Sequence, residues 1–305
     1  MGMAASGLAL IALKSAEFSK IVTQELVKLL SSDREEVRQR ASEALRDMAA
    51  GENTGSSKNR TGGGGGGGGG AKGVKGLVNL LRDGLKTDNV EAQEYALWSL
   101  SKEGDSTSRL AMVECGMIAP TIDALASGKL SAVAQEHAAV VLSGLAPMGD
   151  NAIAIKEAGG IEPLARLLRE GQFDAKEHAA VTCAQLARRA QSAYPIAEAG
   201  GVAAFVSWLR DPTIGPPEVA ARALSEIALD NPDTQAQIAE EGAIGELITM
   251  ISTWAAAAAA AAAGGVSVSS MALKLANVAA GCLATLAKDH IVNQIMITEE
   301  HGRQS

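Results

Sequence analysis

The chain has 305 residues, a formal net charge of −8 and three cysteines. The acidic balance argues against a nucleic-acid partner, because binding to phosphates draws its affinity from Lys and Arg. Cys115, Cys183 and Cys282 are too far apart along the chain to indicate a disulfide framework or a zinc site. We therefore expect a protein of a reducing compartment, the cytoplasm or the nucleus.

Positions 1–50 contain an apolar stretch and the beginning of a helical pattern. Residues 3–13 are apolar but lack the basic region of a secretory signal. Gly2 stands in a loose match to the N-myristoylation pattern, so a lipid anchor at Gly2 stays open. No uninterrupted apolar stretch reaches the length of roughly 18 residues that predicts a membrane span. We assign 1–50 to a partial repeat and a first repeat.

Residues 51–73 interrupt this pattern with Gly, Ser, Asn, Thr and Lys. Similar apolar segments begin at Thr23 and Val74, which are 51 positions apart. The similar segments later in the chain recur about every 42 residues, and the excess of nine equals the nine glycines of 62–70. The composition predicts a flexible insertion. Lys72 does not make it a phosphate-binding loop, because the Gly-Lys-Ser/Thr ending is missing and no strand precedes it.

A turn phrase then recurs at a nearly constant interval. Its copies begin at Glu114, Glu157, Glu198 and Glu240, carry Gly at their third position and lead into an apolar stretch. Self-similarity at a fixed period of this length predicts a stacked repeat in which each unit contacts only its neighbours.

Each copy also contains a later segment with apolar or small residues at helical spacing. Ala138, Ala179 and Ala220 begin three such stripes, and a further segment of this kind runs from Glu91 to Ser101. The spacing predicts an amphipathic helix that closes each repeat with one buried face. The cysteines fall at turn or core positions of this pattern.

A second insertion lengthens the later part of the chain. Leu224 and Leu283 hold equivalent positions but lie farther apart than one repeat length, and the segment 255–270, with its nine alanines followed by Gly and Ser, accounts for the excess. Alanine has the highest helix propensity, so we expect the preceding helix to continue past Trp254 as a surface spur. Residues 290–305 begin a repeat that the chain does not complete.

The period near 42, the Glu-Ala-Gly-Gly-Ile turn at Glu157 and the closing helices resemble the armadillo repeat. The resemblance is clearest over 152–229. Within the armadillo family, the chain resembles the vacuolar-protein-8-like and plant-type proteins. It implies an all-α, right-handed α-solenoid of about six three-helix repeats, which spans 74–305 after the first repeat. It also implies that the third helix of each repeat lines a groove that receives a partner segment.

Rows of equivalent positions on the third helices should then select the partner. Four acids are in register, and they either form an acidic rail for a basic partner or complement the helix dipole. Two further rows start at Glu43 and Asp47. The expected partner-binding residues are Glu91, Tyr95, Glu136, Glu177, Gln185, Glu218, Arg222 and Glu226. Nuclear import adaptors carry Trp and Asn in such rows, and their absence here argues against a receptor for nuclear localisation signals.

The sequence predicts a non-enzymatic scaffold that binds a protein or peptide, with no catalytic, metal or cofactor site. His137 and His178 occupy one repeat position beside a Glu, so the repeat explains them better than metal ligation does. Trp208 should lie in the core, whereas Trp254 should be exposed. Two alternatives stay open: the substrate-binding portion of a ubiquitin ligase, and a lipid-anchored scaffold of the vacuolar type.

Overall fold

The computed structural model describes residues 71–263 and 270–304, together with single positions between 21 and 45. Every regular element in 71–263 and 270–304 is a helix, which confirms the all-α solenoid class. The chain divides into two compact units, unit 1 up to Leu145 and unit 2 from Ala146. Most of the predicted first repeat and most of the Gly-rich insertion lie outside the described residues, as do Gly2, Glu43 and Asp47.

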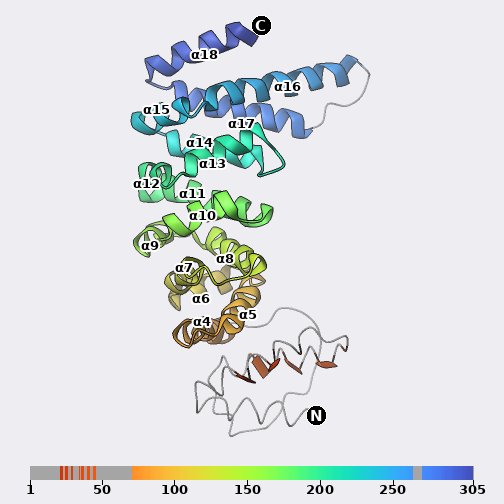
Figure 1. Cartoon of the computed structure of the whole chain (residues 1–305), viewed down its shortest axis with the longest axis vertical. Coiled ribbons are helices and arrows are strands. Elements are labelled where there is room, and N and C mark those ends of the chain that lie inside the picture. The colour runs from red at the N-terminus through yellow and green to blue at the C-terminus, as the bar shows by residue number, and fades with distance from the viewer. Residues whose placement is uncertain are drawn as a thin grey trace. The chain divides into compact units, whose positions relative to one another are not determined.

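Within residues 71–145, unit 1 contains one helix pair and one complete three-helix repeat (Figure 1). The pair consists of α4 (Ala71–Lys86), which begins inside the expected linker, and α5 (Val90–Ser101). The repeat consists of α6 (Ser106–Glu114), α7 (Ile118–Ala126) and α8 (Ala132–Leu145). Helix α5 packs against both α4 and α8, so the two closing helices are neighbours.

The described part of unit 2 contains three complete three-helix repeats and one more helix. In chain order these are α9 (Asn151–Glu157), α10 (Ile161–Glu170), α11 (Phe173–Ala190), α12 (Ala193–Glu198), α13 (Gly201–Arg210), α14 (Pro217–Ala228), α15 (Pro232–Glu240), α16 (Ala243–Ala263), α17 (Ser270–Ala287) and α18 (Ile291–Gln304). The third helices α11, α14 and α17 pack on one another in sequence.

The recurring glycine of the turn phrase ends the first helix of each repeat. Gly116, Gly159, Gly200 and Gly242 all have positive φ, between 66° and 88°. This left-handed conformation is open to glycine because it lacks a Cβ, and it is the usual way to stop an α-helix and redirect the chain. The turn phrase therefore recurs because the backbone needs glycine there.

Three arginines at or near the ends of second helices bind the turn of the following repeat. Arg82 donates to the carbonyl of Cys115 at 2.5 Å, Arg169 to that of Ala199 at 2.5 Å, and Arg210 to that of Glu241 at 2.9 Å. These carbonyls follow the last turn of a first helix, where they lack an intrahelical donor. Each arginine thus satisfies a free carbonyl and links two consecutive repeats within its unit.

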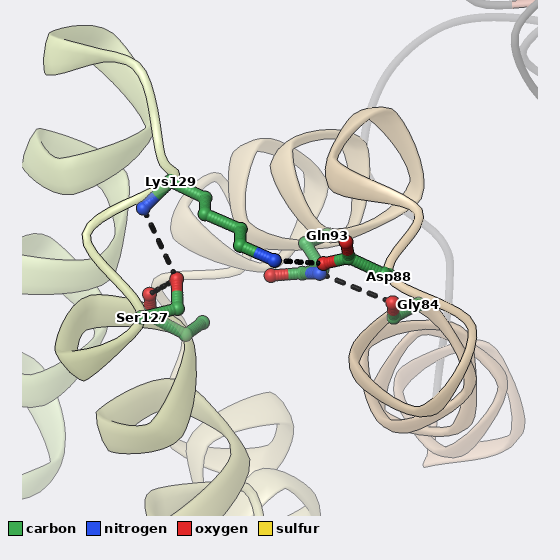
Figure 2. A network of polar contacts seen from close by, with 6 residues as sticks. Gly84, Asp88, Gln93, Ser127 and Lys129 are labelled. Atoms are coloured by element: carbon green, nitrogen blue, oxygen red, sulfur yellow. Dashed lines mark hydrogen bonds and ion pairs between the residues drawn. The ribbon is translucent and has the colours of Figure 1, made fainter.

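A polar network also joins the loops of unit 1 (Figure 2). Lys129 binds Asp88 at 2.6 Å, and its backbone N–H donates to Ser127 Oγ at 3.2 Å. Beside them Gln93, which is buried, donates to the carbonyl of Gly84 at 3.1 Å. The loop before α8 is therefore held to the loop between α4 and α5.

The core of unit 2 includes an aromatic pair in α13. Trp208 and Phe205 are both buried and meet edge to face, with ring centroids 5.4 Å apart. The ring of Trp208 lies against the backbone of Gly215, where there is no room for a Cβ. The prediction that Trp208 belongs to the core is confirmed.

The nine alanines continue α16 as a helix up to Ala263. The described side chains between 255 and 260 are exposed, but α16 packs along α17, so the projecting element is a pair of helices and not a lone spur (Figure 1). Trp254 is half-buried, contrary to the expected exposure. A large indole ring at the base of a packed helix pair finds neighbours that the alanine sequence does not reveal.

Among the described residues, no helix combines the length and apolarity needed to cross a bilayer.

Candidate partner-binding surface

Each unit has its own surface of interest. The name third-helix face is used for the half-exposed side chains on α5 and α8 in unit 1 and, separately, for those on α11, α14 and α17 in unit 2. Ala138, Ala179 and Ala220 have no exposed area, so they fix which side of each helix is buried. The positions counted from these alanines reach the surface in most of the repeats. Their role in partner binding stays a prediction.

The four acids in register are half-exposed, but they do not share one relation to the helix dipole. Glu91 and Glu218 lie in the first turns of α5 and α14. Glu136 and Glu177 are the fifth residues of α8 and α11, which begin at Ala132 and Phe173. Because the dipole acts mainly within the first turn, it explains the first two acids and not the other two.

Two carboxylates of unit 2 are already held by arginines of the same face. Arg222 binds Glu218 at 2.9 Å within α14, and Arg188 of α11 lies 3.9 Å from Glu226 of α14. Such exposed pairs contribute about 0.2–1 kcal/mol each. Glu177 forms no ion pair among the described residues, so the expected acidic rail is partly neutralised in unit 2.

Polar side chains on all three third helices of unit 2 form hydrogen bonds on this face. On α11, Gln185 is half-exposed and accepts a hydrogen bond from Arg189 Nε at 3.1 Å. Ser225 of α14 and Thr285 of α17 lie 3.0 Å apart through their hydroxyl oxygens. Polar contacts thus connect neighbouring third helices across unit 2.

Tyr95 does not lie on the surface, contrary to the sequence-based expectation. Its side chain is 4% exposed and its ring centroid lies 5.8 Å from that of Trp98, one turn later on α5. Helix α5 packs against both α4 and α8, which leaves the ring of Tyr95 little contact with solvent. Trp98, at 41% exposed, is the aromatic side chain that the described part of unit 1 presents to solvent.

Arg109 occupies a place on the third-helix face of unit 1 that the sequence analysis missed. It extends from α6 across Gly144 of α8, where a Cβ would lie 3.3 Å from Arg109 Nε. The glycine leaves room for the guanidinium. Arg109 forms no ion pair within the described part of the chain, and it lines a cavity of about 30 Å³ with Ser101, Glu103 and Gly144.

The capping pattern at the start of the first helices could have revealed Arg109. Asp105 caps α6 through the N–H groups of Thr107 and Ser108, as Asn231 caps α15 through that of Thr234. Counted from these caps, Arg109 corresponds to Gln235, which donates to the carbonyl of Thr285 on its own third helix at 3.1 Å. Arg109 and Gln235 thus both reach from the first helix to the third helix of their own repeat, one as a cation and the other as an amide.

The two histidines fit the structural role expected for them. Both are half-buried, and His137 Nδ1 lies 3.2 Å from the hydroxyl of Ser101 on the neighbouring α5. Desolvation lowers the pKa of His137, with a smaller lowering by Lys102 and an opposing effect of Glu136. No group of three His, Cys, Asp or Glu within the described ranges could hold a metal ion. Burial raises the pKa of Cys183 and of Cys282 to about 12, which makes both thiols unreactive.

Comparisons of sequence found no match among protein-family models and none among curated proteins. Comparisons of structure found similar solved structures. The designed armadillo repeat protein YIII(Dq)4CqI is 19% identical, with a TM-score of 0.57 over 86% of this chain and 98% of its own. This chain has an armadillo-type fold.

Two further structural neighbours have partners in their descriptions. A designed armadillo repeat protein in complex with the peptide (KR)4 is 19% identical, with a TM-score of 0.54 over 85% of this chain and 98% of its own. A structure described by a phosphorylation switch that controls the interaction between cadherin and β-catenin is 17% identical, with a TM-score of 0.59 over 86% of this chain and 44% of that one. At these identities the likeness establishes the armadillo fold and not the partner.

Proposed function

We propose that this chain is a non-enzymatic scaffold that binds a segment of another protein along the third-helix face. The observation that supports this most is the stacking of α11, α14 and α17, which repeats half-exposed polar positions from helix to helix. Neighbouring helices are about 8–10 Å apart, so an extended chain can meet each row in turn. We place this activity in the cytoplasm or the nucleus.

The carboxylates without an ion pair among the described residues are the strongest candidates for contacts with Lys or Arg of the partner. These are Glu136 in unit 1 and Glu177 in unit 2. Glu218 and Glu226 would contribute only if a partner competes with Arg222 and Arg188 for them. The complex of a designed armadillo protein with (KR)4 supports basic side chains as one element of the partner.

The proposal is tested by selecting binding peptides from a random extended library displayed on phage, with the full chain as bait. We expect the selected peptides to bind Glu136→Gln and Glu177→Gln several-fold more weakly, because exposed ion pairs each contribute about 0.2–1 kcal/mol. Asp123→Asn in α7 and Glu240→Gln in α15 are matched controls, since both remove an exposed acid from another helix.

Selected peptides whose affinity follows the control positions and ignores the third-helix positions would refute the proposal. Catalytic turnover of a bound peptide would refute its non-enzymatic part.

A further inference from the structure

The third-helix face carries opposite charges at its two edges. On α8 of unit 1 the acid Glu136 lies in the N-terminal half, and Arg109 lies over Gly144 near the C-terminal end. On α11 of unit 2 the acid Glu177 likewise lies in the N-terminal half, and Arg188 and Arg189 lie in the last turn. On α8 and on α11 the face thus has an acidic edge and a basic edge, whereas on α14 the acid Glu226 lies near the C-terminal end, 3.9 Å from Arg188.

The distance between the edges suits an extended chain. Residues 136 and 144 are eight positions apart, which is about 12 Å along a helix. In an extended chain successive side chains point to opposite sides, and sheets that pack about 10 Å apart imply a reach of about 5 Å on each side. Lys and Glu reach further than average side chains, so their charged ends can meet both edges at once.

From this geometry we propose that the third-helix face selects an extended partner segment in which basic and acidic residues alternate. This rests on the proposed function, and it names the class of partner. In either unit, alternation places the cations of the segment on the side of Glu136 or Glu177, and its carboxylates on the side of the arginines. A uniformly basic segment would bring Lys or Arg against the basic edge, where like charges repel.

Unit 1 has the groups free to make these contacts. Glu136 and Arg109 form no ion pair within the described residues, so neither must give up an internal partner. The cavity of about 30 Å³ beside Arg109 has room for about two water-sized groups, such as the two oxygens of a carboxylate, and a guanidinium binds a carboxylate through paired hydrogen bonds.

Glu103 reduces the attraction at this edge of unit 1. Its carboxylate lines the same cavity and accepts a hydrogen bond from Ser108 Oγ at 3.3 Å. Because Glu103 repels a second carboxylate, the contribution of Arg109 should fall in the lower part of the range for exposed ion pairs. On the face of unit 2, Arg188 and Arg189 are exposed, and Arg188 lies at a long 3.9 Å from Glu226.

The test compares two fluorescent twelve-residue peptides of identical composition, one with six alternating Lys-Glu pairs and one with six Lys followed by six Glu. Both are titrated into the full chain at low salt and followed by anisotropy. We expect the alternating peptide to bind at least about fivefold more tightly, which corresponds to about 1 kcal/mol. Glu136→Gln should weaken it by a factor of about 1.5 to 5, and Arg109→Gln, which copies Gln235, by a factor near the lower end of that range.

The controls separate this inference from the proposed function. Circular dichroism shows whether each variant keeps its helix content, and Asp123→Asn should leave both affinities unchanged. Equal affinity for the two peptides, or tighter binding of the block peptide, would overturn the alternating-charge inference. If the alternating-charge inference fails but peptides selected from the library still depend on Glu136 and Glu177, the proposed binding function is retained without it.

Discussion

The two units follow one repeat pattern but treat its side chains differently. Unit 2 buries the aromatic pair of Phe205 and Trp208 and binds Glu218 and Glu226 to arginines of its own. Unit 1 leaves Trp98 41% exposed, and its Glu136 and Arg109 form no ion pair among the described residues. The position in the repeat therefore determines where a side chain points. Its neighbours determine whether it is held in an internal contact or is available to a partner.

The largest effect should come from the aromatic side chains. We expect Trp208→Ala to lower the free energy of unfolding by about 3–5 kcal/mol, because it leaves a large cavity beside Phe205. Trp98→Ala should cost about 1 kcal/mol or less, since much of that ring is already in water. Urea unfolding followed by circular dichroism measures both. Similar losses for the two variants would contradict the contrast between the units.

A smaller effect should follow from two glycines of unit 2. Gly242→Ala forces alanine to φ near +88° and places its Cβ 3.0 Å from Arg210 Nη2, so we expect a loss of about 1–2 kcal/mol. Gly281→Ala is the matched control, because Gly281 lies exposed inside α17 with no atom near its missing Cβ. There the higher helix propensity of alanine should gain about 0.5–1 kcal/mol. Thermal unfolding of the two variants shows whether Gly242→Ala lowers the stability while Gly281→Ala raises it.

The smallest effect concerns pH and unit 1. The pKa of His137 is lowered by desolvation, so below the ordinary value near 6.5 the unfolded chain binds more protons than the folded one. The stability contributed by neutral His137 should therefore decrease as the pH falls from 6.5 through the lowered pKa. Unfolding measured at pH 7.5 and pH 5.5 should show a smaller decrease for His137→Gln than for the unchanged chain. An equal decrease would mean that His137 does not contribute.

The sequence predicted the repeat phase well, because the requirement for glycine at positive φ and the helical stripes beginning at Ala138, Ala179 and Ala220 are local properties. It predicted the surface less well. Whether Tyr95 is exposed depends on how α4 and α8 cover α5, which local spacing does not contain.

The relation of the acids to the helix dipole also depended on information outside the repeat register. Helices α8 and α11 begin four positions before Glu136 and Glu177, so acids in register need not share a first turn. Arg109 escaped notice because its place on the face comes from α6 and from the missing Cβ of Gly144, two segments that are far apart in the sequence.

The alanine helix of α16 has a consequence for how the chain tolerates change. A run of identical residues can gain or lose members without altering its character, and each alanine lengthens the helix by about 1.5 Å and turns it by about 100°. Because the alanine side chains described between 255 and 260 are exposed, such changes add or remove surface and leave the repeat core as it is. The length of the alanine tract can therefore vary while the stacked repeats keep their register.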